Sequence, residues 1–225
     1  MTLISIIIPT KNRNKFLKKA VLSVLKQTYD DWELLIINDY GNKIKLDIND
    51  NRIRIEKNQY SKGGNGARNT GILLSQGEFI AFLDDDDEWE KEKLKKQLDV
   101  MSRKNVVLCY TGKNIFYNKR KSIIKKSSFN KSYFSPKCTL YFHNYIGTTS
   151  SIMIRANFVK QSNYKFDETL FILQDYDFYL QLCDLGDFIG IKDNLVKYNY
   201  DPNRKHVPLK INKFILAIKK IYAKQ

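Results

Sequence analysis

Four consecutive aspartates, Asp84 to Asp87, directly follow an apolar segment (residues 79–83) that has the composition of a buried strand. Neighbouring negative charges repel one another, and each loses hydration where a buried strand ends, so a positive group is expected beside them. In an extended chain alternate side chains share a face, so we expect Asp84 and Asp86 to converge on one point. That geometry suits a hard divalent cation that keeps some waters and bridges a diphosphate. The alternative is a helix-capping box formed by Asp87 and Glu90, although a cap requires only one aspartate.

Apolar runs alternate with helical patterns through the first half of the chain. This alternation predicts strands at 3–8, 32–37, 52–56, 79–83 and 106–110, and helices at 14–27, 63–74 and 90–101. The order predicts the α/β class, with a right-handed, doubly wound, mostly parallel sheet. Ligands bind such sheets outside the carboxyl ends of the strands. Thr10, Asp39 and the acidic run each follow a predicted strand, so we expect one binding site at this edge.

The second half of the chain is less regular. Residues 118–145 are rich in Lys, Ser, Asn and Tyr, which predicts a long loop or irregular insert of the kind that is often functional. A strand at 151–154, a helix opening at Gln174 and a strand or strand pair at 188–196 are expected to follow. Residues 209–225 predict a basic amphipathic helix, which can lie on an anionic membrane surface or pack on its own domain or a partner subunit.

The composition narrows the classes of partner and compartment. The chain has 225 residues, which suits one α/β domain, and a formal net charge of +15. A positive field attracts nucleic acid, anionic lipid and phosphorylated substrates alike. We predict no nucleic-acid partner, because no reader module is recognisable and the aromatic residues fall mainly in core-like runs. No apolar run is long enough to cross a bilayer, no signal-peptide pattern follows Met1, and the three cysteines are widely spaced, so we expect a cytoplasmic protein.

Several short motifs occur in the order seen in one enzyme family. They are Ser5-Ile6-Ile7-Ile8-Pro9-Thr10-Lys11-Asn12-Arg13, Gln27-Thr28-Tyr29, Trp32-Glu33-Leu34, Asn38-Asp39, Gly66-Ala67-Arg68-Asn69 and Phe82-Leu83-Asp84-Asp85-Asp86-Asp87. With these motifs the chain resembles the inverting family 2 glycosyltransferases, which have the GT-A fold. The resemblance covers roughly residues 3 to 200 and implies a nucleotide-sugar-binding half at 1–112 and an acceptor-binding half with the catalytic base at 113–200. The basic amphipathic helix is assigned to the remaining residues, 201–225.

The resemblance also implies a reaction. A sugar would pass from a nucleotide diphosphate sugar, with a UDP-sugar favoured, to a hydroxyl group of a glycan or lipid-linked acceptor. The pathway would be the synthesis of a surface polysaccharide such as capsule, lipooligosaccharide or O-antigen. The enzyme would be cytoplasmic and able to sit peripherally on the inner face of the cell membrane. A cofactor cation, Mn²⁺ or Mg²⁺, would be held by Asp86 and would act as a Lewis acid on the departing diphosphate.

The nucleotide-binding residues are those that match the family motifs. Asp39 would contact the base, and Asp84 would lie near the ribose, with Asp85 between Asp84 and the metal. The complete set is Pro9, Thr10, Asn12, Asp39, Arg68, Asp84 and Asp85. An alternative for Asp39 is that it only forms the turn before Gly41.

On the acceptor side, Asp175 matches the family's general base, which takes the proton of the acceptor hydroxyl. Its alternative is a helix N-cap. We assign Trp89, Gln174 and Asp177 to the acceptor and sugar pocket, and Trp89 is equally consistent with a core aromatic. Gln174 stands where many relatives carry Glu, so a negative charge is lost there.

Three assignments stay open at this point. His206 is interpreted as an ordinary exposed histidine, with contact to the diphosphate as its alternative. A nucleotidyltransferase would share the sheet and the carboxylates, but such enzymes usually carry a glycine-rich basic signature where this chain has Pro9 to Arg13. A catalytically inactive family member that only binds sugar nucleotide is the last alternative, because of Gln174.

Overall fold

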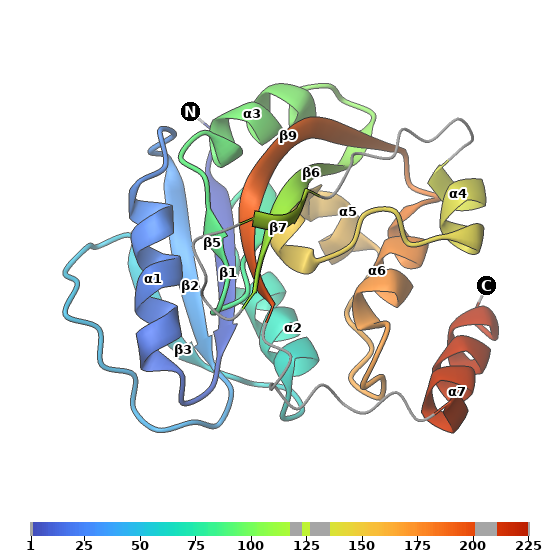
Figure 1. Ribbon diagram of the computed structural model, residues 1–225, viewed down its shortest axis with the longest axis horizontal. Helices are drawn as coiled ribbons and strands as arrows, with labels where there is room; N and C mark the ends of the chain where they lie inside the picture. Colours follow the sequence, from blue (N-terminus) through green and yellow to red (C-terminus); the bar gives the residue numbers. More distant parts are fainter. Residues whose placement is uncertain (1, 118–122, 127–135, 201–210, 225) are drawn as a thin grey trace.

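One mixed sheet organises the molecule (Figure 1). The computed structural model describes residues 2–117, 123–126, 136–200 and 211–224. Within these residues a nine-stranded sheet has the order β3-β2-β1-β4-β8-β6-β9-β5, with β7 paired to β6. The strands are β1 Ile4–Thr10, β2 Trp32–Asn38, β3 Ile53–Lys57, β4 Phe79–Phe82, β5 Glu88–Trp89, β6 Val106–Tyr117, β7 Ile123–Lys126, β8 Ile152–Arg155 and β9 Asp187–Tyr200. The predicted α/β class is confirmed.

The parallel part of the sheet brings polar strand ends together. Strands β3, β2, β1 and β4 pair in parallel, with Thr10 opposite Asn38 and Ile7 opposite Phe82. The residues that follow β1, β2 and β4 therefore meet at one edge, as the sequence predicts. Strand β8 then joins β4 and β6 antiparallel to both, and the long strands β6 and β9 pair in parallel beyond it.

Helices cover both faces of the sheet (Figure 1). They are α1 Asn14–Leu25, α2 Gly64–Leu74, α3 Lys93–Met101, α4 Pro136–Phe142, α5 Ala156–Gln161, α6 Gln174–Leu182 and α7 Ile211–Tyr222. Residues from α1 and α3 share one apolar core with Ile6 and Ile8 of β1, while residues from α2, α4, α5, α6 and α7 share the other core with Ile7. This alternation follows from the two-residue period of a strand. Gly71 lets α2 approach β1 closely, because a Cβ there would lie 2.4 Å from Ile7.

The acidic run does not continue the strand. The chain turns there, since the Asp87 amide donates to the Asp84 carbonyl at 3.0 Å, so the expectation of an extended chain with alternating side chains is wrong. The capping box is also wrong, because α3 begins only at Lys93 and its N-cap, Glu92, makes no side-chain cap bond. The buried Asp87 carboxylate instead accepts the Ser150 hydroxyl at 2.6 Å, which ties the turn to the 3-10 helix at Thr149–Ser151.

The segment predicted as an irregular insert is partly regular. Strand β6 continues to Tyr117, and β7 and α4 follow, so only parts of 118–145 match the loop prediction among the residues described. His206 and the predicted start of the terminal helix lie outside the described residues.

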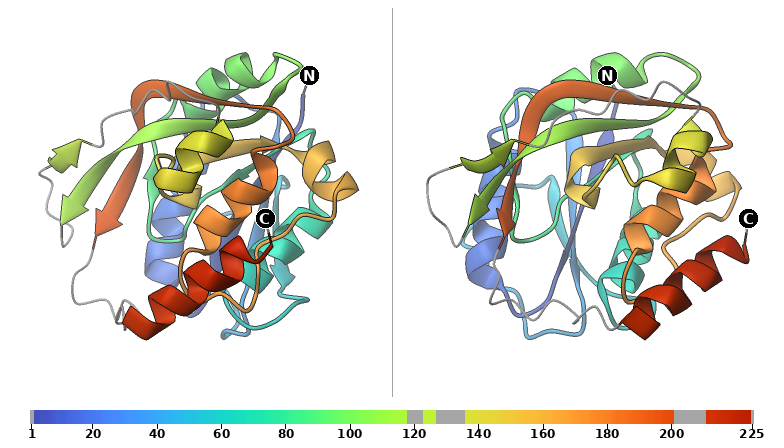
Figure 2. Two further views of the ribbon diagram at one scale, coloured as in Figure 1. Left: turned by 90° about the vertical axis from the view of Figure 1, so that its right-hand side faces the viewer. Right: turned by 45° about the vertical axis from the view of Figure 1, so that its right-hand side comes forward.

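The C-terminal helix α7 packs on its own domain, across α6 (Figure 2). Ala217 and Ile221 enter the core shared with α6, and the Lys224 ammonium lies 2.9 Å from an Asp177 carboxylate oxygen. Phe214, Ile215 and Leu216 stay exposed. In the described part of the chain no helix combines the length and apolar character that crossing a membrane requires.

Candidate active site

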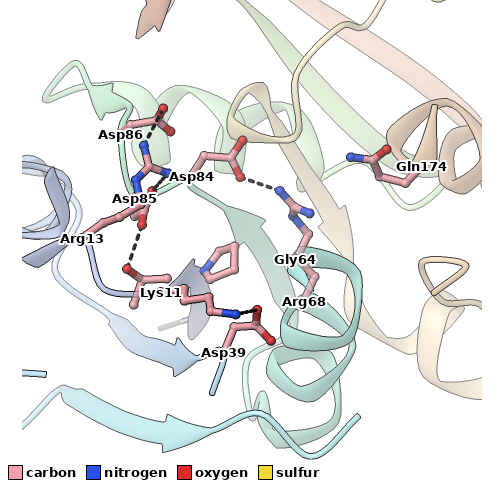
Figure 3. Close-up of a pocket in the computed structure, with 11 residues that line it drawn as sticks. Lys11, Arg13, Asp39, Gly64, Arg68, Asp84, Asp85, Asp86 and Gln174 are labelled. Atoms are coloured by element: carbon pink, nitrogen blue, oxygen red, sulfur yellow. Dashed lines mark hydrogen bonds and ion pairs between the residues drawn. The ribbon is translucent and has the colours of Figure 1, made fainter. Parts of the chain in front are cut away.

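A pocket of about 360 Å³ opens where β1, β2 and β4 end (Figure 3). Eight of the residues that line it were predicted as site residues: Pro9, Thr10, Asp39, Arg68, Asp84, Asp85, Asp86 and Gln174. Three were not: Lys11, Arg13 and Gly64. We call this cavity the donor pocket.

Two arginines form ion pairs with three of the four aspartates in the acidic run. The Arg13 guanidinium lies between two carboxylates, 2.6 Å from Asp85 Oδ1 and 3.1 Å from Asp86 Oδ2 (Figure 3). Arg68 pairs with Asp84 at 2.6 Å. The expected positive group is therefore supplied, in this structure, by side chains that come from the loop after β1 and from α2.

Asp85 makes contact with both a cation and a hydroxyl group. Burial raises the pKa of Asp85 to about 6, while Arg13 and the Thr10 hydroxyl, which donates to Asp85 Oδ2 at 2.7 Å, act in the opposite direction. Desolvation thus outweighs the arginine at this carboxyl group.

Asp39 lines the donor pocket with one of its oxygens occupied. Its Oδ1 accepts the Asn58 amide at 2.9 Å and the Gly63 backbone N–H at 2.8 Å, while its Oδ2 lies 4.0 Å from the Lys11 ammonium. The alternative in which Asp39 forms the turn before Gly41 is wrong. Asn38 does so instead, since its Oδ1 accepts the Gly41 amide at 2.9 Å.

Arg68 is buried one turn into α2, beside the N-terminus of that helix. Besides its ion pair with Asp84, its guanidinium lies 5.5 Å from the centre of the Phe166 ring. Its Nε is buried and has no hydrogen-bond partner among the residues described. A buried donor of this kind is available to a ligand oxygen.

A second pocket of about 330 Å³ adjoins the first and holds the predicted base. The two share Arg68, Asp84 and Gln174, and the second adds Lys113, Gly147, Thr148, Thr149, Asp175 and Tyr198. We call it the Asp175 pocket. Its polar lining brings a carboxylate and an ammonium group into one cavity.

Asp175 is inside the first turn of α6, not at its N-cap. Helix α6 begins at Gln174, and its N-cap is Leu173, so the N-cap alternative for Asp175 is wrong. Burial raises the pKa of Asp175, opposed by the Tyr176 backbone N–H, which donates to it at 2.8 Å, and by the charge of Arg68. A carboxylate with a raised pKa is a better proton acceptor near neutral pH.

Three predicted residues lie away from these pockets. Trp89 is a core residue, whose indole N–H donates to the Ser150 carbonyl at 2.9 Å, in line with its alternative. Asp177 is buried against Gln181 and Lys224. Asn12 accepts the Asn42 amide at 2.6 Å and so holds the neighbouring loop.

The donor pocket fits a cation that takes only part of its ligands from protein. Among the described residues no group of three or more His, Cys, Asp or Glu side chains is placed to hold a metal ion. Mg²⁺ usually binds through one or two carboxylates together with water and substrate phosphates. The guanidinium between Asp85 and Asp86 shows that a positive charge is accommodated there, so the donor set suits Mn²⁺ or Mg²⁺.

The residues that sequence reasoning missed are mostly cations. Lys11 and Arg13 belong to the loop after β1, and their basic character opposite an acidic run was the available signal. Lys113 and Tyr198 gave no signal, because their positions depend on the pairing of two strands that are distant in the sequence. In that pairing of β6 with β9, Lys113 lies opposite Val196 and Tyr198 lies opposite Ile115.

Comparison with known protein families gives one match. The family model described as Glycosyl transferase family 2 matches residues 5–162 of this chain. The matched segment contains every residue of the donor pocket except Gln174.

Two curated relatives are named as glycosyltransferases. The chain is 42% identical over 120 residues to the UDP-Glc:alpha-D-GlcNAc-diphosphoundecaprenol beta-1,3-glucosyltransferase WfgD of Escherichia coli, covering 52% of this chain and 47% of that protein. It is 32% identical over 193 residues to the putative colanic acid biosynthesis glycosyl transferase WcaA of Escherichia coli K12, covering 80% of this chain and 66% of that protein. The match to WfgD thus spans about half the length of that relative.

A solved structure shares the fold. The crystal structure of S. aureus TarS 1-349 in complex with UDP aligns with a TM-score of 0.73 and 19% sequence identity, covering 98% of this chain and 64% of that one. This likeness confirms the predicted GT-A architecture.

Proposed function

Because this chain belongs to glycosyl transferase family 2, we propose that it is an inverting glycosyltransferase that moves a sugar from a UDP-sugar to a hydroxyl group of a glycan or lipid-linked acceptor. The observation that carries the proposal is the junction of the two pockets at Arg68, Asp84 and Gln174. A donor in one pocket and an acceptor in the other would meet there, with Asp175 on the acceptor side.

The second oxygen of Asp39 supports a uracil base in the donor pocket. Two donors already occupy Oδ1, so Oδ2 is the oxygen available to accept the ring N–H of a base. Uracil carries such an N–H, and cytosine presents an acceptor nitrogen at the same ring position. UDP should therefore bind more tightly than CDP, and Asp39→Asn should weaken UDP binding.

We propose that the diphosphate of the sugar donor binds to the cations of the donor pocket. Arg68, Arg13 and Lys11 provide fixed positive charge there, and the Arg68 Nε is a buried donor without a partner in the described residues. We assign Asp86 as the protein ligand of Mn²⁺ or Mg²⁺, which when bound supplies Lewis-acid stabilisation of the charge on the departing diphosphate. Asp84 and Asp85 orient the two arginines.

Asp175 is assigned as the general base. Its carboxylate takes the proton from the acceptor hydroxyl as that oxygen forms its bond to the anomeric carbon. The bond from the anomeric carbon to the diphosphate oxygen breaks on the opposite face, so the configuration inverts. The raised pKa of Asp175 supports this assignment. Gln174 lies beside both substrates as a neutral hydrogen-bonding group.

We further propose a role in assembling a bacterial cell-surface polysaccharide on the cytoplasmic side of the membrane. Relatives named for a diphosphoundecaprenol acceptor and for colanic acid biosynthesis support it. Peripheral attachment to an anionic membrane surface is supported by α7, which exposes Phe214, Ile215 and Leu216 beside the exposed Lys219 and Lys220.

Donor binding and transfer test the proposal. Calorimetry with UDP and CDP in the presence of Mn²⁺ should show tighter binding of UDP. In transfer or hydrolysis assays with a panel of nucleotide sugars, Asp175→Asn and Asp86→Asn should each lower the rate by about 10² to 10⁴. Asp193→Asn removes a carboxylate that pairs with Lys96 outside both pockets, and it serves as the matched control. If both site variants retain the wild-type rate, the assigned roles are wrong.

A further inference from the structure

We propose that Lys113 and Thr148 form a phosphate-binding subsite for the acceptor, one that selects glycosyl phosphates over neutral sugars. The inference rests on the proposed function, because it takes the Asp175 pocket as the acceptor pocket. Both side chains line that pocket, and neither lines the donor pocket.

The backbone of β6 aims Lys113 at the pocket. The pairing of β6 with β9 shifts register on both sides of Gly112, directly before Lys113. Such irregularities re-aim side chains next to binding sites. The strands pack closely here, because a Cβ on Gly112 would lie 2.1 Å from Asn194 Oδ1 and that side chain would have to move. Asn194 in turn donates to Asn114 at 2.8 Å, which fixes the strand on the other side of Lys113.

The Lys113 ammonium is partly desolvated and lacks a direct anionic partner among the described residues. It lies 4.8 Å from the centre of the Tyr198 ring. Gly147 is also close, because a Cβ atom added to that glycine would lie 3.2 Å from the ammonium nitrogen. Burial lowers the pKa of Lys113, and the more distant charges of Asp87 and Asp175 oppose this. A partly buried cation in this state is stabilised by an anionic ligand.

Thr148 provides a hydroxyl group in the lining of the same pocket. Its Oγ1 accepts the Ser150 backbone N–H at 3.3 Å, which leaves the hydroxyl proton to donate elsewhere. The adjoining Gly147 has φ +83° and no side chain, so the backbone leaves room for a ligand beside the ammonium. An ammonium and a hydroxyl donor in one pocket suit the oxygens of a phosphate group.

The phosphate is assigned to the acceptor because of where the other charges lie. The donor pocket has two cations that the Asp175 pocket lacks, Lys11 and Arg13, and shares Arg68 with it. Lys113 instead shares a cavity with Asp175, whose carboxylate must face the acceptor hydroxyl. A phosphate held by Lys113 would thus fix one end of an acceptor sugar while its hydroxyl meets Asp175.

Titration with small soluble probes tests the subsite. With UDP and Mn²⁺ present, wild-type protein is titrated with N-acetylglucosamine 1-phosphate and with the neutral methyl glycoside of N-acetylglucosamine. We expect the sugar phosphate to bind more tightly. Lys113→Met should raise its Kd by about tenfold or more, as expected for a lost hydrogen bond to a charged group, and leave the Kd of the methyl glycoside unchanged. Lys113→Arg, which keeps the charge, should retain most of the preference.

The control is Lys165→Met, which removes a lysine that lies over the Tyr60 ring, outside both pockets. It should leave both Kd values unchanged. The subsite is refuted if wild-type protein does not prefer the sugar phosphate, or if Lys113→Met weakens UDP and not the sugar phosphate. Lack of UDP binding by wild-type protein would instead refute the proposed function itself.

Discussion

Replacing Lys93 by methionine should stabilise this protein at neutral pH, and by an amount that depends on pH. Lys93 is fully buried on α3, with its ammonium against the Trp89 ring and hydrogen-bonded to Gln97. Among the described residues no carboxylate pairs with it. Burial lowers the pKa of Lys93 from 10.5 to about 7.

The pKa shift sets the size and sign of the effect. Between about pH 7 and pH 10.5 the folded protein holds fewer protons at Lys93 than the unfolded chain does, so the free energy of unfolding rises with pH in this window. The slope approaches about 1.4 kcal/mol per pH unit, and the full cost of burying the charge, roughly 5 kcal/mol, is reached below the window. Methionine has no such proton equilibrium.

Urea unfolding, followed by circular dichroism, measures the difference. The stability advantage of Lys93→Met over wild type should shrink by about 2 kcal/mol between roughly pH 7 and pH 9. The neighbouring Cys109 thiol, whose pKa burial raises to about 12, stays protonated up to pH 9 in both folded proteins, so its contribution nearly cancels in the difference. Lys95→Met, which removes an exposed lysine from the same helix, is the control and should follow wild type. An advantage that is equal at both pH values would refute the reasoning.

Three further predictions concern the site and the helix that supports it. Because the pKa of Asp175 is raised, the transfer rate should begin to fall on acidification at a higher pH than it would if the base had the pKa of an ordinary aspartate. In a pH–rate profile, Asp175→Asn should abolish this fall in rate on the acidic side. Arg13→Gln leaves its two carboxylate partners without its counter-charge, so it should lower the melting temperature, and Mn²⁺ should raise that temperature more in the variant than in wild type. Lys224→Met leaves the buried Asp177 without its cation and should cost about 1 to 3 kcal/mol in urea unfolding, whereas Lys219→Met should cost little.

The sequence was most informative about features that the local residue pattern and the direction of the strands are enough to determine. Apolar runs located β1, β2 and β4, and since parallel strands end at one edge, the convergence of Thr10, Asp39 and Asp84 followed. Functional roles for these residues stay predictions, as does the division of the chain into a donor half and an acceptor half.

The rest depended on contacts that no local pattern encodes. The turn that begins at Asp84 is stabilised by Ser150, 66 residues away in the chain, whose hydroxyl accepts the Asp84 amide at 3.0 Å. Strand β6 continues through polar residues such as Lys113 and Asn114 because β9 pairs with them, and polar composition alone predicts a loop. Helix α3 starts at Lys93 instead of Glu90, and the Glu90 amide donates to the Leu195 carbonyl of β9 at 3.0 Å, which holds this residue against the sheet.

The guanidinium between Asp85 and Asp86 gives these two carboxylates a counter-charge from within the chain. A protein with this built-in counter-ion can fold and persist before any cation or nucleotide arrives. Under the proposed mechanism, the metal would take the place of this guanidinium, so one positive charge would replace another. That exchange would weaken the binding of the incoming ligand and speed the release of the nucleotide product. Arg13 would in this way tune turnover without touching the sugar.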